Sequence, residues 1–145
     1  MKILLRNILA LLAGVFAGVV LVSAIQFVNN RLYPTPEGFD PRNAEMMRQY
    51  VATLPLAAFL IVLLSYLVGF TAAVGLAARL SATAHQRQGV LVAAFFGAVS
   101  VLNLRAFPHP VWFWVGNLVV LLAAIWFGLR WGLPRNPPPA PEQCS

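Results

Sequence analysis

The sequence predicts an all-α integral membrane protein, a four-helix bundle followed by a disordered, proline-rich C-terminal tail. Of its 145 residues, 60% are hydrophobic and only 10% are charged, whereas soluble domains carry about a quarter charged residues. The hydrophobic residues form four long stretches, and a helix of about 20 apolar residues crosses the core of a bilayer. Because these stretches are continuous instead of alternating, they are predicted to be helices that pair their own backbone groups, not strands of a β-barrel.

The predicted helices cover residues 3–28, 41–80, 84–107 and 110–132, so that residues 1–132 form the transmembrane domain and residues 133–145 the tail. The first stretch contains no acidic residue, but its start, MKILLRN, also resembles a secretory signal peptide with a cleavage site at Val22-Ser23-Ala24. The apolar run is longer than in most signal peptides and three further spans follow, which favours retention of the first helix and leaves cleavage as the alternative.

The second helix is predicted to begin outside the membrane, after an irregular loop rich in proline and glycine. Asp40 is expected to be its N-cap and Pro41 its first helical residue. Pro55 lies within the same pattern, where it removes a backbone donor, so it should kink the helix or mark a break just before it.

The third helix is expected to start at Ala84, because Thr83 and Gln86 have the spacing of a capping box. The third and fourth helices are separated by a tight turn within the stretch NLRAFPHPVWFW. Phe107 and His109 each precede a proline, which disfavours helical angles, so the turn is placed there.

Aromatic residues flank the fourth helix. Because consecutive helical residues point about 100° apart, the run at its start is predicted to ring the helix at one depth, as an interfacial aromatic belt does. The predicted interfacial anchors are Trp112, Phe113, Trp114 and, at the other end, Trp131.

The basic residues are distributed unequally between the two sides of the membrane. With a cytoplasmic N-terminus, the inner side holds six, namely Lys2, Arg6, Arg79, Arg87, Arg130 and Arg135, and the outer side holds four, namely Arg31, Arg42, Arg48 and Arg105. This bias favours a bacterial inner-membrane protein with both termini in the cytoplasm. The net charge of +6 is explained by anionic lipid head groups and requires no nucleic acid.

Small residues recur at four-residue intervals in the first two spans. Gly14 and Gly18 form a GxxxG step, and Gly69 and Ala73 form a similar step in the second span. Such steps let helix backbones approach closely. Packing within the chain is the favoured interpretation, and a dimer interface is the alternative.

Polar residues gather toward the outer half of the predicted bundle, namely Gln26, Ser100, Asn103, Arg105 and Asn117. Polar groups are costly in lipid, so these side chains are expected to face the bundle interior. They would form either hydrogen bonds between helices or a small polar cavity that opens outward.

Nothing in the sequence predicts a catalytic or metal site. His85 and His109 are separated by one membrane span, and no carboxylate or cysteine lies near either, whereas zinc requires several such ligands. Cys144 is the only cysteine, so no internal disulfide is expected. No enzyme activity, metal or cofactor is therefore expected.

Two motifs, YPTPEGFDP at Tyr33–Pro41 and NLRAFPHPVWFW at Asn103–Trp114, make the chain resemble a group of small uncharacterised bacterial four-span inner-membrane proteins. The resemblance implies a four-helix membrane protein and no activity. The expected function is accessory or structural, through contacts with lipids or membrane proteins. The expected partners are the bilayer and either another membrane protein or a second copy of the chain. The alternative is an oligomeric transporter or channel for a small solute.

Overall fold

The computed structural model describes residues 2–106 and 109–134, and they form five helices and no strand. The helices are α1 (Lys2–Leu32), α2 (Ala44–Thr53), α3 (Leu56–Leu80), α4 (His85–Ala106) and α5 (Val111–Gly132). All but α2 are long and apolar enough to cross a membrane, so the predicted all-α membrane bundle is confirmed. Leu133 and Pro134 follow α5 without helical structure, and the rest of the predicted tail lies outside the described residues.

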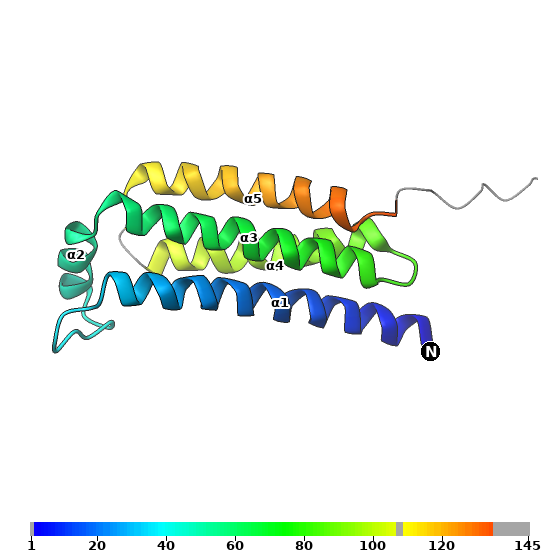
Figure 1. Cartoon of the computed structure of the whole chain (residues 1–145), viewed down its shortest axis with the longest axis horizontal. Helices are drawn as coiled ribbons and strands as arrows, with labels where there is room; N and C mark the ends of the chain where they lie inside the picture. The colour runs from blue at the N-terminus through cyan, green and yellow to red at the C-terminus, as the bar shows by residue number, and fades with distance from the viewer. Residues whose placement is uncertain (1, 107–108, 135–145) are drawn as a thin grey trace, which may run out of the picture.

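The four long helices lie side by side, and α3 is central among them (Figure 1). It packs against α1, α4 and α5, whereas α1 touches α4 more lightly. The short helix α2 crosses one end of the bundle, called here the α2 end, and the start of α1 lies with the end of α5 at the opposite, terminal end (Figure 1). The described chain therefore begins and finishes on the same side, as four spans require.

Small residues bring α1 and α3 into backbone contact. A Cβ added at Gly14 would lie 2.6 Å from the carbonyl oxygen of Ala73, and one at Gly18 would lie 2.8 Å from the Cβ of Ala73. A Cβ at Gly69 would lie 3.0 Å from the carbonyl oxygen of Gly18. These four residues thus lie at an interface within the chain.

A second close contact joins α3 to α5. A Cβ added at Gly128 would lie 2.9 Å from the carbonyl oxygen of Thr71 and 2.8 Å from the Cβ of Val74. Gly75 packs in the same way against the Trp131 ring and the Gly128 backbone. The sequence pattern did not predict this second interface.

The start of α2 differs from the prediction. Asn43, not Asp40, is the N-cap, and its side chain accepts hydrogen bonds from the backbone N–H groups of Glu45 (3.0 Å) and Met46 (3.2 Å). The Asp40 carboxylate instead accepts from the N–H of Arg42 at 2.9 Å, within the preceding turn. Because this local bond stabilises a turn at Pro41, the helix begins three residues later than predicted.

The predicted break at Pro55 is confirmed. Helix α2 ends at Thr53, and Pro55 is the N-cap of α3 with extended backbone angles. Leu54 is extended as well, at φ −71° and ψ 132°, as expected for a residue before proline. The break lets α2 turn away from the axis of α3.

The predicted capping box before α4 was wrong. The hydroxyl that accepts from the N–H of Ala84 belongs to Ser81, at 3.3 Å, and the Thr83 hydroxyl accepts from the side-chain amide of Asn7 at 3.5 Å. The tight loop brings α1 close enough to compete for the Thr83 side chain. At its other end α4 reaches Ala106, and the predicted end at residue 107 lies outside the described residues.

Candidate functional site

A cavity of about 410 Å³ lies at the α2 end, between the bundle and α2. We call it the α2-end chamber. Its lining comes from α1, α2, α3, α4 and the two loops at this end, namely Gln26, Asn29, Asn30, Tyr33, Thr35, Phe39, Met47, Tyr50, Val51, Leu54, Ala58, Phe59, Val62, Tyr66, Asn103 and His109. Among these described lining residues there is no Asp, Glu, Lys or Arg, so the polar groups of this mostly apolar chamber carry no formal charge other than any on His109.

Helix α2 and the loop before it form the roof of the chamber. Met47 is the buried residue of α2 and lines the chamber. The Tyr50 hydroxyl donates a 2.9 Å hydrogen bond to the carbonyl oxygen of Tyr33, and the ring of Phe39 lies 5.2 Å from that of Tyr50. Burial raises the pKa of Tyr50 above its ordinary value of 10.0. These contacts hold α2 to the loop that follows α1.

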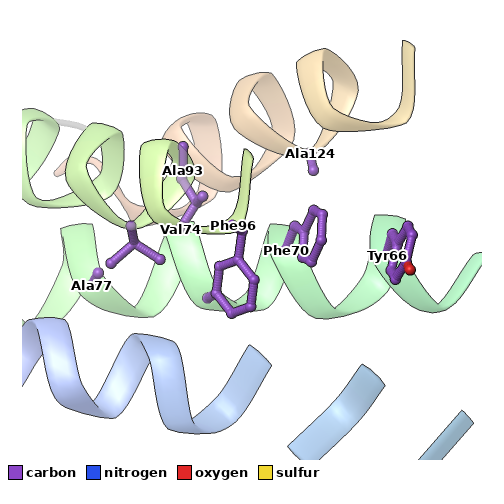
Figure 2. Packing of buried hydrophobic residues seen from close by; sticks show 9 residues of the cluster. Tyr66, Phe70, Val74, Ala77, Ala93, Phe96 and Ala124 are labelled. Carbon is purple, nitrogen blue, oxygen red and sulfur yellow. The ribbon is translucent and has the colours of Figure 1, made fainter. Parts of the chain in front are cut away.

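Aromatic rings form the floor. The Tyr66 hydroxyl accepts a 2.9 Å hydrogen bond from the amide of Asn103, at the chamber wall. Toward the terminal end the Tyr66 ring stacks on Phe70 at 5.2 Å, and Phe70 lies 4.7 Å from Phe96. Figure 2 shows these rings in a row along α3, with Val74 and Ala77 beyond them. Within the described residues, the chamber therefore ends at a packed apolar core.

Asn29 is the least satisfied polar side chain in the chamber wall. It is only 8% exposed, and its amide nitrogen donates a long 3.5 Å hydrogen bond to Gln26. Its side-chain oxygen is buried and has no hydrogen-bond partner. An unpaired buried acceptor costs about 1–3 kcal/mol, so a shift of the Asn29 side chain that let a bound group donate to its oxygen would lower the free energy.

A second hollow of about 240 Å³ lies between α1 and α4. It is mostly apolar, and its lining is Val19, Val22, Ser23, Gln26, Tyr66, Phe70, Phe96, Val99, Ser100 and Asn103. Gln26, Tyr66 and Asn103 line both this hollow and the chamber. We call it the lateral groove, because Val19 and Val99 are exposed on the side of the bundle.

The structure divides the predicted polar cluster. Gln26 and Asn103 line the chamber. Ser100 and Asn117 are buried and bond to each other at 2.8 Å, so they join α4 to α5. Arg105 is exposed and lines neither hollow.

Sequence reasoning missed Asn29, Tyr50 and Tyr66 as site residues. For Asn29 and Tyr66, the sequence contained a pattern that could have identified them. Asn29 follows Gln26 by three residues, which places both on one face of a helix. Tyr66 is the only tyrosine of a mostly apolar span, and a buried phenol requires a hydrogen-bond partner.

One predicted interfacial anchor is wrong. Trp112, Trp114 and Trp131 are exposed by 42%, 39% and 50%, but Phe113 is completely buried. Its ring lies 5.7 Å from that of Phe59 and stacks on His109 at 4.6 Å. Three consecutive residues spread over most of the circumference of a helix, so one of them has to face the bundle.

The terminal end holds a separate set of hydrogen bonds. The Asn7 side-chain oxygen accepts from the Ser81 hydroxyl at 3.0 Å and from the N–H of Ala82 at 2.9 Å, which ties α1 to the loop before α4. His85 lies here, with Nδ1 2.8 Å from the carbonyl oxygen of Ala78, whereas His109 lies at the α2 end. Within residues 2–106 and 109–134, no three His, Cys, Asp or Glu side chains gather as metal ligands would, and Cys144 lies outside this part.

Comparisons of the chain with models of protein families, with curated proteins and with solved structures found no match. The resemblance to bacterial four-span proteins therefore stays a prediction. The broader class, a small multi-pass membrane protein, rests on the four long apolar helices.

Proposed function

We propose that this chain is an accessory protein of the bacterial inner membrane that binds the polar part of a membrane lipid in the α2-end chamber and catalyses no reaction. In this proposal α2 faces away from the cytoplasm, as the excess of basic residues at the terminal end favours. The single observation that carries the proposal is Asn29, whose buried oxygen lacks a partner in the wall of a 410 Å³ cavity.

The size of the chamber supports a bound ligand. Sites for small molecules have volumes of about 300–1,000 Å³ and combine an apolar lining with a few polar groups. The chamber has that composition, with Met47 and Phe59 beside Gln26, Asn29 and Asn103. A ligand that donates to Asn29 would remove the cost of its unpaired oxygen.

The apolar core supports binding over transport. Between the chamber and the terminal end, Ala73, Val74 and Ala77 are fully buried, and they belong to one apolar cluster with Phe70 and Phe96. A polar solute would have to separate these groups to cross a single subunit. The transport alternative predicts flux that is lost when Asn103 and Asn117 are both replaced by leucine.

The test is native mass spectrometry of the protein after gentle extraction from its own membrane. Wild-type protein should carry a lipid, and Asn29→Leu should carry at least ten-fold less, because leucine cannot accept a hydrogen bond. Gln49→Leu is the matched control, since Gln49 is exposed on α2 and does not line the chamber. Its lipid content should equal that of wild type.

Two results would overturn the proposal. One is equal lipid content in wild type and Asn29→Leu, provided that both proteins show a cooperative thermal unfolding transition and are therefore folded. The other is wild-type protein that carries a second polypeptide and no lipid, which would point to a protein partner.

A further inference from the structure

We propose that the ligand of the α2-end chamber is a lipid with an uncharged, hydroxyl-rich headgroup, and that its hydrocarbon chain leaves the protein through the lateral groove between α1 and α4. This inference rests on the proposed function, because it assigns the headgroup chemistry and the path of the chain at the same site.

The first step concerns charge. No Asp, Glu, Lys or Arg is present among the described lining residues of the chamber. A phosphate placed there would have His109 as the one lining side chain able to offset its lost hydration with a positive charge, and a buried charge is far more costly than a buried hydroxyl. The chamber therefore favours an uncharged headgroup over the phosphate of a phospholipid.

The second step concerns hydrogen bonds. The oxygen of Asn29 requires a donor. Tyr66 accepts a bond from Asn103, and a phenol that accepts one bond still has its own proton to donate. The wall thus presents an acceptor on α1 and a donor on α3, and a headgroup with several hydroxyl groups suits both because each hydroxyl donates and accepts. An ammonium group has no lone pair and could not accept from Tyr66.

The third step concerns size. A water molecule occupies about 30 Å³ in the liquid, so a chamber of about 410 Å³ has room for roughly a dozen non-hydrogen atoms. A single sugar ring is of this size, and a glyceryl group is smaller and also fits. A glycosyl diacylglycerol is therefore a suitable probe.

The fourth step concerns the chain. The lateral groove shares Gln26, Tyr66 and Asn103 with the chamber, and most of its other lining is apolar. Val19 and Val99, at its margin, are exposed by 48% and 45% on the side of the bundle. The groove follows the light contact between α1 and α4. A lipid with its headgroup in the chamber can thus keep its chain in contact with the bilayer.

The experiment measures binding of defined lipids to the full-length protein by native mass spectrometry. The probes are a monoglucosyl diacylglycerol, phosphatidylglycerol and phosphatidylethanolamine with the same acyl chains, and methyl glucoside as a headgroup without a chain. We expect the glucosyl lipid to be retained at least ten-fold more than either phospholipid. Methyl glucoside should not displace it at equal concentration.

Ser23→Phe tests the lateral groove. Ser23 lines the groove and is exposed, so a phenylalanine there would fill the groove without disturbing a buried contact. The matched control is Ala24→Phe, because Ala24 is the next residue of α1, is also exposed and does not line the groove. Ser23→Phe should lower retention of the glucosyl lipid at least ten-fold, and Ala24→Phe should not.

The outcomes separate this inference from the proposed function. Equal or stronger retention of phosphatidylglycerol would overturn the uncharged headgroup. Displacement by methyl glucoside, with no effect of Ser23→Phe, would overturn the path of the chain while leaving the chamber as a site. Unchanged retention of every lipid in Asn29→Leu would instead reject the proposed function itself.

Discussion

The hydroxyl of Ser100 donates a 2.8 Å hydrogen bond to the side-chain oxygen of Asn117, and both residues are buried. This bond joins α4 to α5 across the turn between them. Hydrogen bonds between transmembrane helices contribute about 0.6 kcal/mol on average, with values near 2 kcal/mol at the upper end. The bond therefore aligns the two helices more than it stabilises the bundle.

A double-mutant cycle over Ser100→Ala and Asn117→Ala should give a coupling free energy of about 0.6–2 kcal/mol. Each single variant leaves the other polar group buried without its partner. Unfolding in mixed detergent micelles measures the four stabilities. A coupling below about 0.3 kcal/mol, the usual error of additivity, would show that the bond has no net effect.

Gly128→Ala should destabilise the bundle by about 1–3 kcal/mol, which is the usual cost of overpacking. Its new methyl group would press on the backbone of Thr71, which cannot move aside easily. Gly97→Ala is the control, because its methyl group would meet only the end of the Leu121 side chain, at 3.3 Å. Thermal unfolding in detergent should rank the two variants in this order, and equal stability would contradict the described α3–α5 contact.

Phe113→Ala should cost up to about 3–5 kcal/mol, because it leaves a cavity among Phe59, Leu63 and Leu104. Phe127→Ala removes the same side chain from the same helix, but Phe127 is 51% exposed. Its loss should change stability by less than about 1 kcal/mol. The same unfolding assay tests both variants. A larger loss of stability in Phe127→Ala than in Phe113→Ala would contradict the burial of Phe113 and support its role as an interfacial anchor.

Asn43→Ala should loosen α2 by about 1 kcal/mol, the usual cost of losing an N-cap side chain. The two N–H groups that Asn43 accepts from, at Glu45 and Met46, would lose their partner. Hydrogen exchange at these amides should accelerate about five-fold. Asp40→Ala is the comparison, and it should leave exchange at Glu45 and Met46 unchanged. The reverse pattern would restore Asp40 as the cap.

Tyr50 should make the roof of the chamber sensitive to alkali. Burial raises its pKa in the folded protein above 10.0, so the folded state holds its proton more tightly than the unfolded state does. The resulting stability is complete below pH 10 and is lost as the pH rises from 10 through the raised value. The phenolate absorbance of wild type minus Tyr50→Phe should therefore titrate above pH 10, and a midpoint below 10 would contradict the burial.

The four spans could be predicted because each depends on length and hydrophobicity alone. The break at Pro55 could also be predicted, since a missing N–H affects any helix in the same way. The N-cap of α2 could not. Asp40 and Asn43 both suit a cap, and the choice depends on which of them also stabilises the preceding turn.

The candidate site was predicted only in part. Gln26 and Asn103 were identified because polar groups in apolar spans are conspicuous, and both line the chamber. Asn29 was missed because it lies near the end of its span, where a polar residue is ordinary. Its place in the chamber wall depends on how α2 and the loop before it lie at the end of the bundle, and no local pattern encodes that arrangement.

The central position of α3 has a consequence for how the protein is made. Helix α3 packs on α1, and α4 and α5 both pack on α3. Each span that leaves the ribosome after α1 therefore finds its docking surface already in the bilayer. Within lipid, the hydrophobic effect does not drive helices together. Correct assembly therefore depends on each new helix contacting its small-residue docking surface soon after insertion. The helices of this chain can therefore assemble in the order in which they are synthesised. Only α1 is inserted before the helix on which it packs, which is α3.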